Sequence, residues 1–369
     1  MDKIQDCFLQ LLRWGLWKTP VRVEDFVGMN ATEWASLCKI AYQQACGGIV
    51  GDAILSLPKE VLPPKAVVAR LMALLYHLKQ QNEIIEGRLK EISQAYTEAG
   101  LSFLLLKGSG MAQNYPQPHL RAPGDIDLYL YKEGDYDRAN EWAVTHGYKI
   151  EYKVLYEACY HYKEVSIENH LFLTYFGRKK YDKALQQILT PIIEKRTFQK
   201  LNIAGVEIAV LPHTLNAVYL FQHILHHFSY LGIGLRQYSD WLLFLHRYKE
   251  EINKEQFLYY AKKLDLLRPM QHFAEVAIRY LGAPTEIFPF TLTGDSRYAL
   301  IILKDCLKQG NFGFNEFQGK TFSSNFTRQC FFYRRMIKRM WRIGGISPEH
   351  IVSKSWVSIL NQVKKLFIK

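Results

Sequence analysis

The sequence predicts an α/β protein, in which a small, mixed and mostly antiparallel sheet carries helices on one face and is flanked by helical regions. Two patterns predict it. Apolar residues recur at helical spacing before residue 100 and after about residue 213, whereas β-branched and aromatic residues alternate with polar ones between them. A chain of 369 residues with 49% hydrophobic content is long enough to bury a large core. We therefore expect a helical region at 1–100, a mixed core at 101–212 and a helical region with a basic tail at 213–369.

The N-terminal region is expected to end in one long helix, from about residue 65 to residue 98. Its apolar residues fall on one side, and Gly100 follows as a natural stop. We interpret this region as a helical packing domain, and a lid over the core is the alternative.

The core and the C-terminal region divide into shorter elements. In the core we expect strands at 101–106 and 125–130, helices at 109–115 and 136–145, two β-rich runs at 148–156 and 159–173, a helix at 181–194 and a hairpin at 202–210. Further on we expect helices at 215–231 and 238–249, and basic amphipathic segments at 325–342 and 354–368.

Two carboxylates lie in the second predicted strand, as Asp125-Ile126-Asp127. At i and i+2 on a strand they project from the same face, and two like charges so close call for a divalent cation. Upstream, the first strand ends in Lys107-Gly108-Ser109, a glycine-bearing turn whose backbone N–H groups suit a phosphate. The alternatives are that the aspartates cap a turn and that Ser109 caps a helix. Apolar residues on both sides of the aspartates favour a strand.

These motifs resemble the nucleotidyltransferase superfamily of the polymerase-β type, whose signature is hG[GS] followed by [DE]h[DE]. The closer resemblance is to a poorly characterised bacterial branch with L-K-G, R-P-x-G-D-I-D-L and h-E-x-H motifs, and it covers residue 101 to about 173. The chain reads KGS at 107–109 and RAPGDIDL at 121–128. Glu168 and His170 fall on the h-E-x-H positions, where Asn169 and Leu171-Phe172 are less aromatic than the tryptophan usual beside them.

The resemblance implies a nucleotidyltransferase-type catalytic core that uses Mg²⁺ or Mn²⁺ to move a nucleoside monophosphate from an NTP to a hydroxyl acceptor. It makes Asp125, Asp127 and Glu168 the metal-binding and catalytic carboxylates, with Glu168 or a neighbour as the general base. It makes Gly108 and Ser109 the residues that hold the triphosphate.

For two basic residues near these motifs, the sequence is compatible with more than one interaction partner. Lys107 is equally compatible with a triphosphate contact and with a solvated strand end. Arg121 either reaches phosphate or pins its loop by pairing with Asp125 or Asp127, and we favour the pairing.

Four further residues are pocket candidates by resemblance: His170, His227, Arg236 and Asp240. At i and i+4, the last two are by default a surface salt bridge that contributes little. The histidines near residue 227 lack the acidic partner of an HExxH zinc site, so we expect them to pack or to line the pocket.

The positive charge is concentrated in the tail. Residues 328–369 hold ten lysines and arginines against one acid, so they contribute +9 of the formal net charge of +12. Aromatic residues are interleaved with these cations, a pattern that suits RNA or an anionic membrane surface. The alternative is a helix that buries its aromatic side on the protein.

The remaining signals indicate a cytoplasmic location. The six cysteines form no CxxC pair, no signal peptide is recognisable, and no apolar run is long enough to span a membrane. The acceptor stays open among a sugar, another small metabolite, a protein side chain and an RNA end. The alternative function is an inactive nucleotidyltransferase-fold scaffold, localised by its basic tail to RNA or an anionic membrane.

Overall fold

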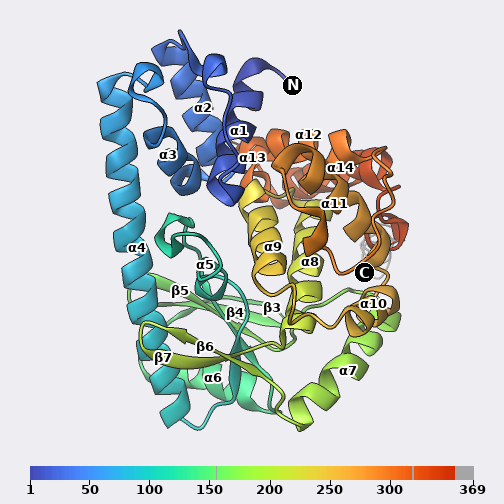
Figure 1. Cartoon of the computed structure of the whole chain (residues 1–369). Helices are drawn as coiled ribbons and strands as arrows, with labels where there is room; N and C mark the ends of the chain where they lie inside the picture. Colours follow the sequence, from blue (N-terminus) through green and yellow to red (C-terminus); the bar gives the residue numbers. More distant parts are fainter. Residues whose placement is uncertain (155, 318–319, 354–369) are drawn as a thin grey trace.

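A computed structural model describes residues 1–154, 156–317 and 320–353. These residues form a sheet of seven strands, with most of the helices above and beside it in Figure 1. The strand order is β3-β4-β5-β2-β1-β7-β6. The strands are β1 (Phe103–Leu105), β2 (Ile126–Leu130), β3 (Ile150–Val154), β4 (Glu157–Tyr162), β5 (Val165–His170), β6 (Gln199–Ile203) and β7 (Val206–Val210). The pairs β2–β5 and β1–β7 are parallel and the other neighbours are antiparallel, which confirms a mixed, mostly antiparallel sheet.

The two β-rich runs predicted at 148–156 and 159–173 form three strands. A tight turn separates β4 from β5, and Lys163 takes a positive φ of 54° in it. Glycine and asparagine are the usual markers of such a turn, and lysine is not, so the break is hard to see in the sequence.

The N-terminal region is helical, as predicted. Its helices are α1 (Lys3–Trp17), α2 (Ala31–Gln43), α3 (Gly47–Leu55) and α4 (Lys65–Glu98). The long helix α4 has the predicted bounds and runs from the N-terminal helices down along the sheet (Figure 1). Its last turns join the core of the sheet, because Ile85, Leu89, Ile92 and Tyr96 pack in one cluster with sheet residues. The Tyr96 hydroxyl also donates to Asn169 Oδ1 of β5 at 2.9 Å.

Helices cover both faces of the central strands, so the expectation of helices on one face is wrong. One face packs against α4 and α6 (Asp135–Thr145), with Leu105 and Leu128 among the buried residues. On the other face, Leu104 and Tyr129 belong to the cluster of α8 (His213–Tyr230). All five residues of β2 are buried, as a strand covered on both sides requires.

The C-terminal region is also helical. Besides α8 it contains α9 (Leu235–Arg247), α10 (Lys254–Lys263), α11 (Leu267–Leu281), α12 (Ala299–Gln309), α13 (Phe314–Phe317) and α14 (Asn325–Ile343), and the core adds α5 (Ser109–Ala112) and α7 (Lys179–Glu194). None of the described helices is both long enough and apolar enough to cross a membrane. The amphipathic segment predicted at 354–368 lies outside the described residues.

The basic helix α14 uses its buried arginines to hold the C-terminal region together. Arg339 pairs with buried Asp305 at 2.8 Å, and Arg335 pairs with Glu316 at 2.6 Å and donates to the carbonyl of Leu231. Cations that are neutralised inside the protein are not available to an external polyanion. Within the described part of this helix, Arg334 and Lys338 remain exposed, as does the Trp341 ring, which is 85% exposed.

Candidate functional site

Two acidic residues meet where β2 pairs with β5. In this parallel register Asp127 lies opposite Glu168, and both project from the sheet face that meets α8. His170, two residues after Glu168, places its Nε2 3.1 Å from Asp127 Oδ1 and 3.6 Å from Glu168 Oε2. Possible ligand atoms of the three residues all lie within 4.8 Å of one another. The structure therefore brings together three predicted site residues from two strands.

Lys107 completes this cluster. Its Nζ lies 2.9 Å from the same Oδ1 of Asp127, and the side chain is 23% exposed. The interpretation of Lys107 as a solvated strand end is therefore wrong: the ammonium group turns inward to a buried carboxylate.

The electrostatics of the cluster follow from these contacts. Burial alone would raise the pKa of Asp127, but the charge of Lys107 and the hydrogen bond from His170 hold it below its usual value. Burial alone would lower the pKa of His170, but the hydrogen bonds to Asp127 and Glu168 raise it to about 9. Burial raises the pKa of Glu168, and Asp127 adds to that rise. Two cations thus balance two carboxylates in this structure.

The donor set fits a divalent cation. Two carboxylates are the usual ligands of Mg²⁺ and Mn²⁺. An imidazole nitrogen that has released its proton is a better ligand for a transition-metal ion than for Mg²⁺. Among the described residues this is the single group of three or more potential ligands, and it contains His170 where the sequence prediction had Asp125.

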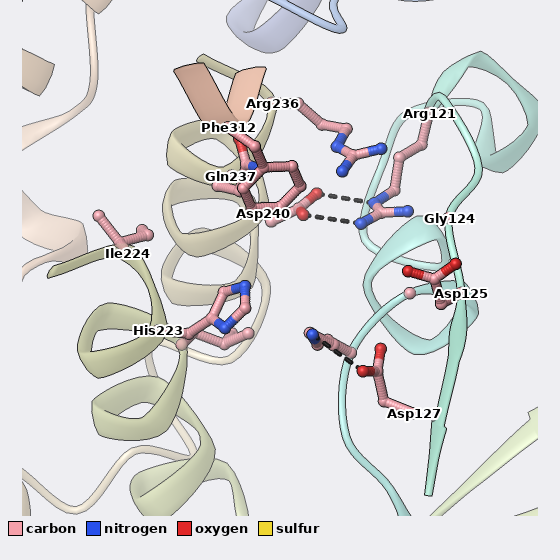
Figure 2. Close-up of a pocket in the computed structure, with 13 residues that line it drawn as sticks. Arg121, Gly124, Asp125, Asp127, His223, Ile224, Arg236, Gln237, Asp240 and Phe312 are labelled. Carbon is pink, nitrogen blue, oxygen red and sulfur yellow. Dashed lines mark hydrogen bonds and ion pairs between the residues drawn. The ribbon is translucent and has the colours of Figure 1, made fainter. Parts of the chain in front are cut away.

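Asp125 lies just before β2, at the edge of the same space, and Figure 2 shows its carboxylate above that of Asp127, on the side of Arg121. Desolvation by the surrounding protein raises the pKa of Asp125, and the negative charge of Asp127 raises it further. Gly108 packs directly against the backbone of Asp125. The glycine has a φ of +63°, and a Cβ on it would lie 2.8 Å from the Asp125 carbonyl oxygen. Ser109 is buried at the start of α5.

Arg121 does not pair with either predicted aspartate. Its guanidinium forms two hydrogen bonds with Asp240 of α9, at 2.8 and 2.9 Å, and Tyr115 donates to the same carboxylate at 2.9 Å. The pairing predicted with Asp125 or Asp127 is therefore wrong. Folding brings α9 closer to the arginine than the strand that follows it in sequence.

Arg236 and Asp240 do not form the expected surface salt bridge. Asp240 is buried with Arg121, and Arg236 donates to the carbonyls of Ala122 and Pro123, both at 3.1 Å. This side of α9 faces the core, so both residues fasten the loop that leads into Asp125 (Figure 2).

Three histidines of α8 face the site from the opposite wall: His223, His226 and His227. Burial, together with the charge of Lys107, keeps the pKa of His223 well below its usual value, so this ring is neutral at pH 7. All three histidines line the larger cavity, and the metal-capable group of the described residues includes none of them.

Two adjoining cavities open at the carboxylates. The smaller, of about 60 Å³, is bordered by Gly108, Gly124 and Arg236, and the larger, of about 310 Å³, by Glu168 and His170. Lys107, Asp125, His223 and Phe312 border both. The sequence did not indicate Tyr115 or Phe312 as site residues, because neither belongs to a motif and Phe312 arrives from a distant segment.

Comparisons with known proteins place the chain in a family. No curated protein matches it. The solved structure of an antigenic nucleotidyltransferase-like protein from Paracoccidioides brasiliensis aligns at 13% identity with a TM-score of 0.32, covering 54% of this chain and 92% of that one. A TM-score of 0.32 is too low to show a shared fold. A family described as uncharacterised nucleotidyltransferases matches residues 30–282, well beyond the motifs on both sides. This match spans more than half of the chain, which therefore belongs to that nucleotidyltransferase family.

Proposed function

We propose that this protein uses Mg²⁺ or Mn²⁺ to transfer a nucleoside monophosphate from an NTP to a hydroxyl acceptor. The observation that carries the proposal is the register of β2 against β5, which sets Asp127 beside Glu168 next to the Gly108 turn. Paired carboxylates beside a glycine-bearing turn suit the cation and the triphosphate of a nucleotide.

Asp127, Glu168 and His170 would hold the cation, with Asp125 at the edge of the site as a further carboxylate. When bound, the cation supplies charge stabilisation for the triphosphate and lowers the pKa of the attacking hydroxyl. Glu168 also borders the larger cavity, so its carboxylate suits the role of general base for the acceptor proton.

The smaller cavity suits the triphosphate. Gly108 would offer its backbone N–H group and Arg236 its positive charge, whereas Lys107 borders both cavities and is paired with Asp127. Ser109, buried behind the turn, would position Gly108. The carboxylate of Asp240 already neutralises Arg121, so we assign Arg121 and Asp240 as positioning residues for the loop that carries Asp125. His227 lines the larger cavity and is left without a chemical role in this proposal.

Calorimetric titration of each of the four NTPs, with and without Mg²⁺ or Mn²⁺, tests the proposal. Wild type should bind one NTP in a metal-dependent manner, and Asp127→Asn should lose this binding. Because Asp127 also compensates Lys107, its variant must be checked for folding. Asp125→Asn is the second variant, since Asp125 is exposed and forms no ion pair among those found in the described residues.

The matched control is Asp137→Asn, which removes an exposed acid from α6 on the opposite face of the sheet. Its NTP binding should equal that of wild type. If folded wild type binds no NTP, or if Asp127→Asn binds as wild type does, the proposal fails. The scaffold function with a localising tail then becomes the better account.

A further inference from the structure

The larger cavity differs in chemistry from the smaller one. Aromatic rings dominate its wall: Tyr156, Phe172, Tyr175, Tyr219 and Phe312. The rings of Tyr156 and Tyr175 lie 5.3 Å apart with 30° between their planes, and Tyr175 is 44% exposed. Between the rings stand polar groups, such as Thr174, whose hydroxyl donates to Gln222 Oε1 at 2.8 Å. The wall thus offers flat apolar surfaces with hydrogen-bonding groups beside them.

The charges divide between the two cavities. The smaller cavity is bordered by Arg236, which forms no ion pair among those found in the described residues, and by Arg121, which is paired with Asp240. The described lining of the larger cavity contains no arginine. The cations of that lining, Lys107 and His170, are both paired with Asp127, and the lining also contains Glu157. A phosphate group in the larger cavity would therefore meet acidic residues and no unpaired lysine or arginine of that lining.

Geometry indicates which substrate each cavity holds. In an in-line displacement the attacking hydroxyl and the departing pyrophosphate lie on opposite sides of the transferred phosphorus. The phosphate-binding turn at Gly108 borders the smaller cavity, and Glu168, the general base of the proposed function, borders the larger one. The larger cavity therefore lies where the acceptor must approach.

We propose that the larger cavity binds the acceptor and that the acceptor is a small, unphosphorylated, polyhydroxylated ring of the sugar class. This inference rests on the proposed function. A volume of about 310 Å³ is at the lower end of the range for small-molecule sites, about 300–1,000 Å³. Aromatic faces pack against the C–H faces of a sugar ring, and the polar groups beside them bond its hydroxyls. The lack of an unpaired lysine or arginine in the described lining argues against an RNA end or a sugar phosphate.

Pyrophosphate release, with the NTP and metal ion found by titration, tests the acceptor. The panel is a set of unphosphorylated mono- and disaccharides, the matching sugar phosphates, and a short RNA with a free 3′-hydroxyl. Mass spectrometry checks that the product is the acceptor plus one nucleoside monophosphate. At least one unphosphorylated sugar should be used, with a kcat/KM at least about 100-fold above its phosphate and the RNA.

Tyr175→Ala locates the acceptor in the cavity. Removing this partly exposed ring should raise the KM for the sugar about tenfold and leave the NTP affinity within about twofold of wild type. Tyr76→Ala, which removes a 65% exposed ring from α4, is the control and should change neither value.

Three results would overturn the inference while leaving the proposed function intact. One is better use of the RNA or a sugar phosphate. Another is no turnover of any unphosphorylated sugar by a protein that binds NTP through Asp127. The third is an equal loss of NTP affinity in Tyr175→Ala, which would make the cavity a nucleobase site. Absence of NTP binding in the wild type would instead overturn the proposed function itself.

Discussion

Arg121 and Asp240 form a buried ion pair across 119 positions of the chain, with hydrogen bonds of 2.8 and 2.9 Å. Their side chains are 6% and 9% exposed. The pair joins the loop before β2 to helix α9, and Arg236 fastens the same loop through two backbone carbonyls. The position of Asp125 therefore depends on the C-terminal helical region.

Asp240→Asn should lower the free energy of unfolding by about 3–5 kcal/mol, because it leaves the buried Arg121 guanidinium without a counter-charge. Urea unfolding followed by circular dichroism measures the change. The double variant Arg121→Met with Asp240→Leu should recover most of the loss, since no charge is then buried. Lys200→Gln removes an exposed pair with Glu207 and should leave the midpoint nearly unchanged. An unaltered midpoint in Asp240→Asn would contradict this account.

Gly108→Ala should abolish metal-dependent NTP binding. The new Cβ would lie 2.8 Å from the Asp125 carbonyl oxygen at a φ of +63°, so the turn and Asp125 must move apart. Gly134→Ala is the control, because Gly134 has a φ of +80° but nothing within 4 Å of an added Cβ. It should cost about 1 kcal/mol of stability and keep the affinity for NTP. Calorimetry measures the NTP affinity of both variants and so separates the effect of the clash from that of backbone strain. Equal affinities in the two variants would rule out the clash as the cause.

His170→Gln should weaken Mn²⁺ binding by about 10- to 100-fold and Mg²⁺ binding by less. The imidazole nitrogen is the ligand that favours a transition-metal ion, whereas Mg²⁺ depends on the oxygens of Asp127 and Glu168. Electron paramagnetic resonance of free Mn²⁺, with Mg²⁺ as competitor, measures both affinities. Equal losses for the two ions would mean that His170 supports the carboxylates without binding the metal.

Arg339→Gln should destabilise the protein by about 1–3 kcal/mol, because buried Asp305 keeps only Arg342 as a counter-charge and two backbone carbonyls of α8 lose their donor. Arg334→Gln with Lys338→Gln alters the exposed face of α14 and should leave stability unchanged.

If the tail binds RNA or anionic vesicles, the double variant Arg334→Gln with Lys338→Gln should weaken that binding, and the binding should depend steeply on salt concentration. Unchanged binding would assign any such contact to other residues.

The local pattern of the sequence predicted most of the strands and helices around the candidate site, but it did not separate the helices between residues 254 and 317. The 34 residues of α4 were predicted to the residue, because one apolar stripe runs unbroken between Pro64 and Gly100. The boundary between β4 and β5 was missed, since Lys163 turns the chain without a residue that signals a turn. Alternation and helical spacing are short-range properties, so they specify short-range structure.

The candidate site, too, was predictable from the sequence only in part. The sequence by itself determined that Asp127 and Glu168 lie on strands, and the motifs indicated that they act together. Only the tertiary structure decided which charge meets which: Lys107 turns to Asp127, and Arg121 turns to Asp240. A charged side chain must find its partner when it is buried, and that partner is whichever opposite charge the packed helices and strands bring within reach. The spacing of two charged residues along the chain does not tell how far apart their side chains lie in the folded protein.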